Sequence, residues 1–265
     1  MNIGIFDSGL GGLFIMRHIV KKLPQYNFVY LGDTKRVPYG NRSHETIFSY
    51  TCEALDFLFK KGCVLVILAC NSASAQGLRQ IQQEWLPKKY PNRKVLGVII
   101  PTVEAALLDN PKKIGILATQ GTVGSNTFVK EINKRNRHVR ILQQAAPLLV
   151  PLVESGELKH ARTIIRSYLA PLKQIDSIIL GCTHYGILAH MFRKELRPNQ
   201  RIISQNTIIP DKLAQYLGRH PEIEKKLTTK RKLDFFVTEI TPTNKKMAAR
   251  WFGKHIILRK ASYTD

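Results

Sequence analysis

Two cysteines occupy matching positions along the chain. Cys70 follows the apolar run Val64–Ala69, and Cys182 comes one residue after the apolar run Ser177–Leu180. Both are followed by two residues that can form hydrogen bonds. A thiol acts as a base or nucleophile where a cation, a helix N-terminus or a neighbouring base stabilises its thiolate, and His184 lies two residues beyond Cys182. We therefore predict that Cys70 and Cys182 are functional thiols.

Polar residues follow two other apolar runs. Asp7 comes directly after Ile3–Phe6, where a carboxylate either caps the next helix or serves an active site. The segment 119–122 (TQGT) follows Ile114–Ala118 and offers hydroxyl and backbone N–H groups that either cap a helix or hold an anion such as a substrate carboxylate. The local sequence leaves both alternatives open at both positions.

The elements that position these residues alternate between strand and helix. Short β-branched runs predict strands buried on both faces of a parallel sheet, and segments of helical period lie between them. This alternation predicts α/β doubly wound architecture, in which ligands bind outside the carboxyl ends of the strands. The predicted strands are Ile3–Phe6, Phe28–Leu31, Val64–Ala69, Val95–Ile99, Ile114–Ala118, Ser177–Leu180 and Phe235–Thr238, and the predicted helices are Gly12–Lys22, Glu45–Lys61 and Val123–Arg135.

The matching settings of the two cysteines form a faint internal repeat. We therefore expect two pseudo-symmetric doubly wound domains with mainly parallel sheets and an active site in the cleft between them. The predicted first domain comprises residues 1–97 and 207–265, and the second comprises residues 98–206. In this arrangement the basic segment after Gln205 is helical and returns to the first domain.

Composition excludes several classes of protein. The chain has 265 residues, of which 44% are hydrophobic and 23% charged, so it is neither a disordered tail, a collagen-like fibre nor a disulfide-stapled miniprotein. The longest apolar run, Cys63–Cys70, ends at Asn71, well short of the roughly 20 residues of a membrane span. The N-terminal residues do not resemble a signal peptide, and four cysteines do not make a disulfide framework. We expect a cytoplasmic protein with free thiols, in which Cys52 and Cys63 are core residues.

The net charge is strongly positive. The chain has 41 Lys and Arg against 19 Asp and Glu, which gives +22. Such a charge attracts nucleic acid, anionic lipid or small acidic metabolites, or reflects a proteome shifted toward basic residues. No nucleic-acid motif supports the first of these.

Two motif-based alternatives fit less well. The Gly9–Gly12 loop lacks the third glycine of a dinucleotide fingerprint because Phe14 stands there, so we expect close backbone approach to a small ligand instead. A zinc site of Cys70, Cys182, His184 and Asp7 would have an awkward Cys-x-His spacing. We predict neither a cofactor nor a metal.

Taken together, these residues resemble the glutamate racemases of the aspartate/glutamate racemase superfamily. The resemblance covers residues 1–186 in family order, whereas the basic C-terminal part matches only loosely. Two positions within it depart from the family pattern: Ser72 stands where Thr is usual, and Gly186 where Pro is usual. The matching segments are 7–12 (DSGLGG), 31–34 (LGDT), 37–41 (VPYGN), 69–75 (ACNSASA), 119–123 (TQGTV), 150–156 (VPLVESG) and 181–185 (GCTHY).

The resemblance implies a cofactor-independent racemase that interconverts L- and D-glutamate and supplies D-glutamate for peptidoglycan. It implies that Cys70 and Cys182 are the paired acid and base, since racemisation removes a proton from one face of the carbon and returns one to the other. Asp7 and His184 would assist them, with Asp33 and Glu154 as further carboxylates. The implied substrate-binding residues are Asp7, Ser8, Tyr39, Gly40, Asn71, Ser72, Thr119, Thr122, Thr183 and His184.

Other functions stay open at this stage. A racemase of aspartate or another amino acid would use the same two thiols. A Cys-His hydrolase would need only Cys182 and His184 and would tolerate the loss of Cys70. We expect a homodimer with glutamate as substrate and no membrane association, and the net charge leaves nucleic-acid binding open.

Overall fold

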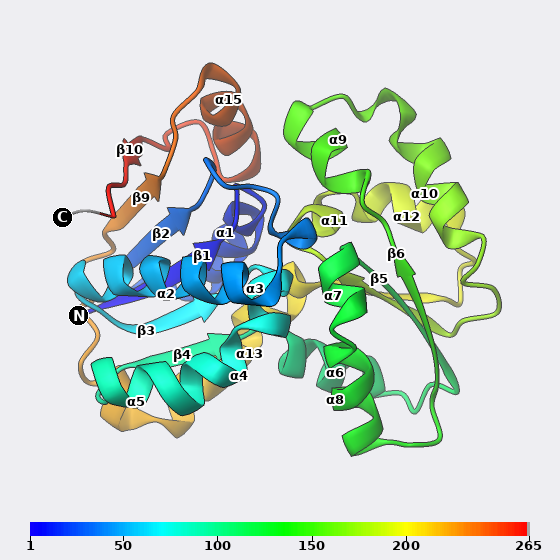
Figure 1. The fold of residues 1–265 in the computed structure, drawn as a ribbon, viewed down its shortest axis with the longest axis horizontal. Coiled ribbons are helices and arrows are strands. Elements are labelled where there is room, and N and C mark those ends of the chain that lie inside the picture. Colours follow the sequence, from blue (N-terminus) through cyan, green and yellow to red (C-terminus); the bar gives the residue numbers. More distant parts are fainter. Residues whose placement is uncertain (264–265) are drawn as a thin grey trace.

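Two parallel sheets form the framework of the chain, for which a computed structural model describes residues 1–263 (Figure 1). The larger sheet has six strands in the order β10-β9-β2-β1-β3-β4, and the smaller has four in the order β6-β5-β7-β8. All strand pairs in both sheets are parallel. The strands are β1 (Asn2–Asp7), β2 (Phe28–Gly32), β3 (Cys63–Leu68), β4 (Lys94–Gly97), β5 (Lys113–Ala118), β6 (Arg140–Ala145), β7 (Ser177–Gly181), β8 (Arg201–Ile203), β9 (Leu233–Val237) and β10 (Leu258–Lys260).

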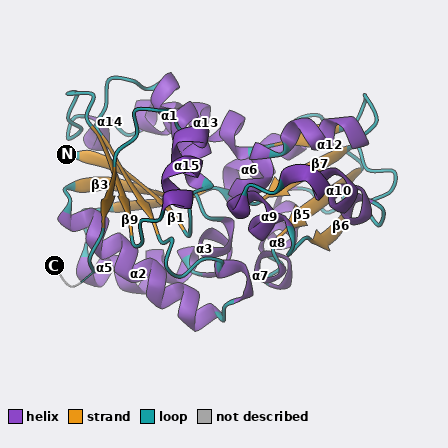
Figure 2. Ribbon diagram, turned by 90° about the horizontal axis from the view of Figure 1, so that it is seen from above, coloured by secondary structure: helices purple, strands orange, loops and turns teal. Residues whose placement is uncertain are grey.

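Helices cover both faces of each sheet (Figure 2). In the larger sheet, Ile3 and Ile5 belong to one apolar cluster and Phe6 and Leu31 to another, so both faces of the sheet are buried. The α-helices are α1 (Gly12–Lys22), α2 (His44–Lys60), α3 (Asn71–Gln76), α4 (Leu78–Gln80), α5 (Leu86–Lys89), α6 (Ile99–Leu107), α7 (Gln120–Gly124), α8 (Thr127–Arg135), α9 (Leu149–Ser155), α10 (Ala161–Leu169), α11 (Thr183–Ile187), α12 (Ala189–Glu195), α13 (Gln205–Arg219), α14 (Pro221–Glu224) and α15 (Pro242–Trp251). Short single-turn segments of other helix types complete the chain at Tyr39–Asn41, Ile81–Trp85 and Leu158–His160.

The two halves share one topology. The first four strands lie in the order β2-β1-β3-β4 and the next four in the order β6-β5-β7-β8, so the third strand of each set lies beside the first. Cys70 follows β3 and Cys182 follows β7, and each is the N-cap of the next helix, α3 or α11. The α/β architecture of two similar parallel halves is confirmed, and the two thiols occupy equivalent positions.

The chain passes between the halves at two places. It leaves the larger sheet between β4 and α6 and returns between β8 and α13, after which β9 and β10 complete that sheet. Helix α13 packs against α1, as expected for a C-terminal segment that returns to the first half. The domain boundaries predicted from the sequence place β1–β4, β9 and β10 in the first domain and β5–β8 in the second.

The interior strands match the sequence prediction closely, but three strands were not predicted. These are β6, β8 and β10, and each is the last strand at one edge of its sheet. An edge strand buries less apolar surface, and β6 (RILQQA) shows no buried residue. Such a strand lacks the continuous apolar run that marks a strand buried on both faces.

Two predicted elements end differently. Val95–Ile99 was expected to be a strand, but β4 ends at Gly97 and Ile99 begins α6. The single helix predicted at Val123–Arg135 is wrong: α7 ends and α8 begins around Asn126, whose φ of 55° is left-handed and stops a helix.

Candidate functional site

Cys70 and Cys182 line the same cavity, and each lies just beyond the carboxyl end of a strand, β3 or β7. The cavity has a volume of about 20 Å³ and receives residues from both halves of the chain. This volume is enough for about one water molecule. The lining residues are Ser8, Val37, Pro38, Tyr39, Gly40, Cys70, Asn71, Ser72, Thr119, Val150, Cys182, Thr183 and His184.

The Cys70 thiol lies among neutral and negative groups. Its Sγ donates to Ser8 Oγ at 3.3 Å, and its side chain is buried. Burial raises the pKa of Cys70 to about 12, and the negative charge of Asp7 adds to this, while the hydrogen bond to Ser8 acts in the opposite direction. In this environment Cys70 is protonated at neutral pH.

Asp7 ends β1 and lies beneath the glycine loop. Its Oδ2 accepts a hydrogen bond from the backbone N–H of Gly9 at 3.2 Å, so the carboxylate holds the turn that follows the strand. Its Oδ1 is buried and has no hydrogen-bond partner among the described residues. Burial raises the pKa of Asp7, although the charge of His184 acts against this. A carboxyl group of raised pKa with one unpartnered oxygen is suited to exchanging a proton.

The Cys182 thiol lies beside a charged pair. Its Sγ is 3.7 Å from His184 Nδ1, and His184 Nε2 is 2.5 Å from Glu154 Oε1. Helix α9 provides Glu154, while α11 begins directly after Cys182 and carries His184 in its first turn. The three side chains therefore form a line from sulfur to imidazole to carboxylate.

His184 and Glu154 each stabilise the charged form of the other. Burial disfavours the charged form of His184, but the carboxylate of Glu154 and the hydrogen bond with Cys182 outweigh it and raise the pKa of His184. Burial likewise opposes ionisation of Glu154, and the imidazolium outweighs it and lowers the pKa of Glu154. An imidazolium beside a sulfur atom stabilises the thiolate form.

A group of hydroxyls from both halves forms another wall of the site. Ser72 Oγ lies 3.1 Å from Thr119 Oγ1 and 3.4 Å from Thr122 Oγ1. Thr119 also caps α7, because its side chain accepts a hydrogen bond from the backbone N–H of Thr122. The capping interpretation of this segment therefore holds, and Thr119 additionally lines the cavity.

Glycines let the two halves approach one another. A Cβ on Gly11 would lie 2.5 Å from Thr183 Oγ1, and one on Gly40 would lie 2.7 Å from Thr119 Cβ. Both distances are too short for any residue with a side chain. The glycine loop predicted to approach a small ligand thus also brings the first half against Thr183 and His184.

Four predicted site residues do not line the cavity themselves: Asp7, Asp33, Thr122 and Glu154. Asp33 is poorly suited to assist a cysteine directly, because its carboxylate already accepts hydrogen bonds from Tyr39, Arg36 and Thr238. The other ten predicted residues line the cavity.

Some residues at the site were not predicted. Val37, Pro38 and Val150 line the cavity, and each lies within a segment that carried the family resemblance. Gln205 begins α13 and forms a reciprocal pair of amide hydrogen bonds with Asn71, at 2.8 and 2.6 Å. Because this pair joins segments 134 positions apart, nothing in the local sequence marks Gln205.

The described residues contain neither a metal-binding cluster nor a membrane-spanning helix. Among residues 1–263, no group of three or more His, Cys, Asp and Glu side chains is arranged to hold a metal ion. No helix in the described part of the chain is both long and apolar enough to cross a membrane.

Comparison with known proteins identifies the family of the chain. The family model described as Asp/Glu/Hydantoin racemase matches residues 4–209. This chain belongs to that family. A glutamate racemase of Roseobacter denitrificans is 40% identical over 236 residues, which cover 83% of this chain and 87% of the relative.

Solved structures of racemases share the whole fold of this family member. Glutamate racemase isoform RacE1 from Bacillus anthracis has a TM-score of 0.88 and 32% identity, covering 98% of this chain and 97% of that one. Glutamate racemase from Francisella tularensis, solved in complex with D-glutamate, has a TM-score of 0.87 and 30% identity, covering 99% and 97%.

Proposed function

We propose that the protein is a glutamate racemase that interconverts L- and D-glutamate by proton transfer between two cysteines, without a cofactor. The observation that carries the proposal is that Cys70 and Cys182 line one cavity from opposite halves of the molecule. The family membership and the names of the relatives support the choice of substrate.

In the proposed reaction the thiols work as an acid and a base. In one direction, the Cys182 thiolate removes the α-proton, which forms an S–H bond and leaves a carbanion. The Cys70 thiol then delivers its proton to the opposite face of the carbon and becomes a thiolate. The reverse reaction exchanges these roles, and no oxidant or reductant is needed.

The neighbouring groups fit these roles. His184, held as an imidazolium by Glu154, is placed to stabilise a Cys182 thiolate, and burial keeps Cys70 protonated. We further propose that Asp7 exchanges a proton with Cys70 and His184 exchanges one with Cys182 between turnovers, so that the Cys70 thiolate regains a proton and the Cys182 thiol loses one, with Glu154 acting through His184.

Hydrogen-bonding groups around the cavity are suited to hold an amino acid. Ser8, Asn71, Ser72, Thr119 and Thr183 line it and offer hydroxyl and amide groups to an ammonium and two carboxylates. Of the other predicted binding residues, Tyr39, Gly40 and His184 also line the cavity, whereas Asp7 and Thr122 do not. Because the cavity holds little more than a water molecule, we propose that the halves separate to admit the substrate.

Isotope exchange tests this function. Purified protein is incubated in deuterated water with L-glutamate, D-glutamate and both enantiomers of aspartate, separately. We expect deuterium at the α-carbon and loss of optical rotation with both glutamate enantiomers. Absence of exchange with glutamate, or faster exchange with aspartate, would reject glutamate as the substrate.

One observation favours a second candidate. The line from Cys182 through His184 to Glu154 also has the geometry of a cysteine hydrolase, which would form an acyl-enzyme on Cys182. Mass spectrometry of protein quenched with amide and ester substrates distinguishes the two, because a racemase accumulates no covalent adduct.

The wider setting follows from the proposed activity. D-Glutamate made in this way would supply peptidoglycan synthesis, and a thiol pair that must stay reduced suits the cytoplasm. We also propose a homodimer, because two-fold dimers are the commonest assembly of soluble oligomeric proteins, to be measured by analytical ultracentrifugation. Nucleic-acid binding, suggested by the net charge of +22, would show as affinity that falls steeply with salt.

A further inference from the structure

The carboxylate of Asp33, which does not line the cavity, accepts three hydrogen bonds. Its Oδ2 accepts from the hydroxyl of Tyr39 and from Nε of Arg36, each at 2.6 Å, and its Oδ1 accepts from the hydroxyl of Thr238 at 2.9 Å. Asp33 is fully buried, and its carboxylate is occupied by these partners. It therefore fixes the phenol of Tyr39, which lines the cavity together with Gly40.

Arg36 is held in turn by groups from two distant segments. Its Nη1 donates to Glu53 Oε2 at 2.7 Å, and its guanidinium carbon lies 3.8 Å from the ring centroid of Tyr50 and 4.8 Å from that of Tyr263. The guanidinium is thus in contact with aromatic rings from α2 and from the C-terminal segment after β10. Such cation–π contacts are strongest where the cation is shielded from water, and the Arg36 side chain is 19% exposed.

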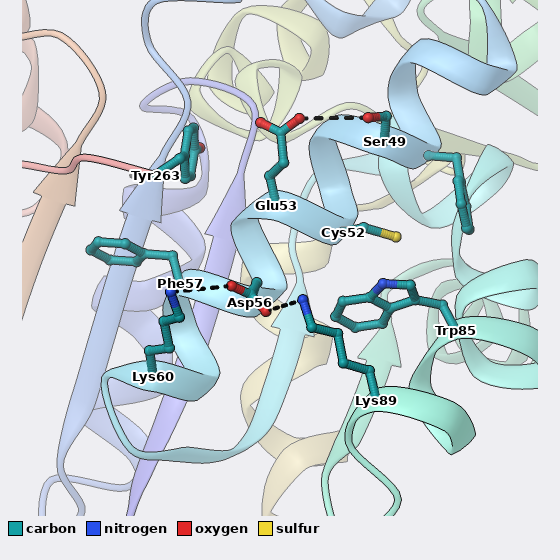
Figure 3. A pocket seen from close by; sticks show the side chains of 10 residues that line it. Ser49, Cys52, Glu53, Asp56, Phe57, Lys60, Trp85, Lys89 and Tyr263 are labelled. Carbon is teal, nitrogen blue, oxygen red and sulfur yellow. Dashed lines mark hydrogen bonds and ion pairs between the residues drawn. The ribbon is translucent and has the colours of Figure 1, made fainter. Parts of the chain in front are cut away.

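The outer side of this arrangement borders a surface pocket of about 330 Å³ (Figure 3). Figure 3 shows Tyr263 and Glu53 on one side of this pocket. Asp56, one turn after Glu53 on α2, and Lys89, at the end of α5, also line it. Tyr263 also packs edge-on against Phe57, with ring centroids 6.3 Å apart. The C-terminal segment is therefore fixed against α2 at the same place where it meets Arg36.

From these contacts we infer that Arg36 and Tyr263 are positioning residues that act through Asp33 to hold Tyr39 and Gly40 in the substrate-binding wall. Neither residue touches the cavity. The inference rests on the proposed racemase function, because it assigns to the C-terminal segment the task of keeping one wall of that site in place. It also gives Asp33 a positioning role through Tyr39 in place of direct assistance to a cysteine.

The test separates positioning from general stability by steady-state kinetics on the intact protein. Tyr263→Ala removes the ring and is expected to raise KM roughly tenfold with a smaller change in kcat, since misplaced wall residues weaken substrate binding. Tyr263→Phe keeps the ring over the guanidinium and is expected to keep KM within about twofold of the unmodified protein.

A matched control uses another aromatic residue of the same half. Tyr90 packs against Phe59 with ring centroids 4.6 Å apart and donates to Asp56, away from Arg36. Tyr90→Ala is expected to lower Tm while leaving KM unchanged. If Tyr263→Ala lowers Tm but leaves KM as in Tyr90→Ala, the inference is wrong.

A second variant covers the case in which Tyr263→Ala does not fold. Arg36→Lys keeps the positive charge but loses the planar contact with two rings and the paired hydrogen bonds, so KM is again expected to rise. An unchanged KM in folded Arg36→Lys overturns the inference. Failure of the unmodified protein to racemise glutamate would instead reject the proposed function, so the two failures are distinguishable.

Discussion

The two halves place their cysteines at equivalent positions but surround them differently. Cys70 and Cys182 each follow the third strand of a shared topology and cap the next helix. Cys70 has a serine hydroxyl at hydrogen-bonding distance and a buried carboxylate nearby, whereas Cys182 has an imidazolium held by Glu154. The backbone thus supplies the symmetry of the site, and a few side chains supply the difference in charge.

This difference shows that a shared fold can give its two thiols unlike electrostatic surroundings. A raised pKa keeps Cys70 a thiol, whereas the positive charge of the His184 imidazolium lies beside the sulfur of Cys182.

The largest expected effect comes from removing either sulfur. Cys70→Ala and Cys182→Ala should each reduce racemisation by about 10³-fold or more, because each removes an acid or base from one face of the carbon. Racemisation is followed by circular dichroism, and substrate binding by calorimetry, which should still detect glutamate. Full racemisation with either thiol absent would eliminate the two-base scheme, and cleavage of an amide or ester substrate that survives in Cys70→Ala but not in Cys182→Ala would favour the hydrolase.

A smaller effect is expected from removing the charge behind His184. In Glu154→Gln the carboxylate that raises the pKa of His184 is lost, so burial lowers that pKa and the imidazolium forms only at lower pH. The alkaline limb of kcat/KM against pH should move to lower pH, with a loss of about tenfold to hundredfold at pH 8. An unmoved alkaline limb would show that Glu154 does not set the charge of His184.

The His184–Glu154 pair also determines how the free energy of unfolding changes with pH. Since the pKa of His184 is raised on folding, its contribution is present below the ordinary histidine pKa and is lost as pH rises through the raised value. Since the pKa of Glu154 is lowered, its contribution is present above the ordinary glutamate pKa and is lost as pH falls through the lowered value. Thermal unfolding of Glu154→Gln should therefore differ most from the unmodified protein between these limits.

The smallest effect is expected beside Cys70. Ser8→Ala removes the hydroxyl that accepts from Sγ and should lower kcat by about threefold to tenfold, the worth of one hydrogen bond. Ser74→Ala is a matched control, because the Ser74 hydroxyl is also buried, in the helix that follows Cys70, but donates to the carbonyl of Leu68. Equal losses of activity in the two variants would show that the Ser8 contact is structural only.

Interior strands and strand-end residues could be predicted because their signals are local. Strands such as β3 and β7 are buried on both faces and have continuous apolar sequences, and the polar residues that follow them lie at the site. Edge strands such as β6 could not be predicted in this way, since a half-exposed strand tolerates polar residues. The break at Asn126 was missed because a left-handed residue interrupts an otherwise regular helical pattern.

Contacts across long sequence separations account for the rest. Gln205 meets Asn71, and Tyr263 meets Arg36, only once the chain has returned to the larger sheet. The resemblance drew attention to Asp33, but it could not reveal that Tyr39, Arg36 and Thr238 occupy its carboxylate. Packing between distant segments determines which polar atoms are left for chemistry.

The unlike surroundings of the two sulfur atoms have a thermodynamic consequence. L- and D-glutamate are mirror images and have the same free energy in water, so an enzyme that interconverts them must have equal values of kcat/KM in the two directions. The imidazolium near one sulfur cannot bias the final mixture toward either enantiomer. It can only make kcat and KM change together, so that the direction with the higher maximal rate also needs more substrate to reach it.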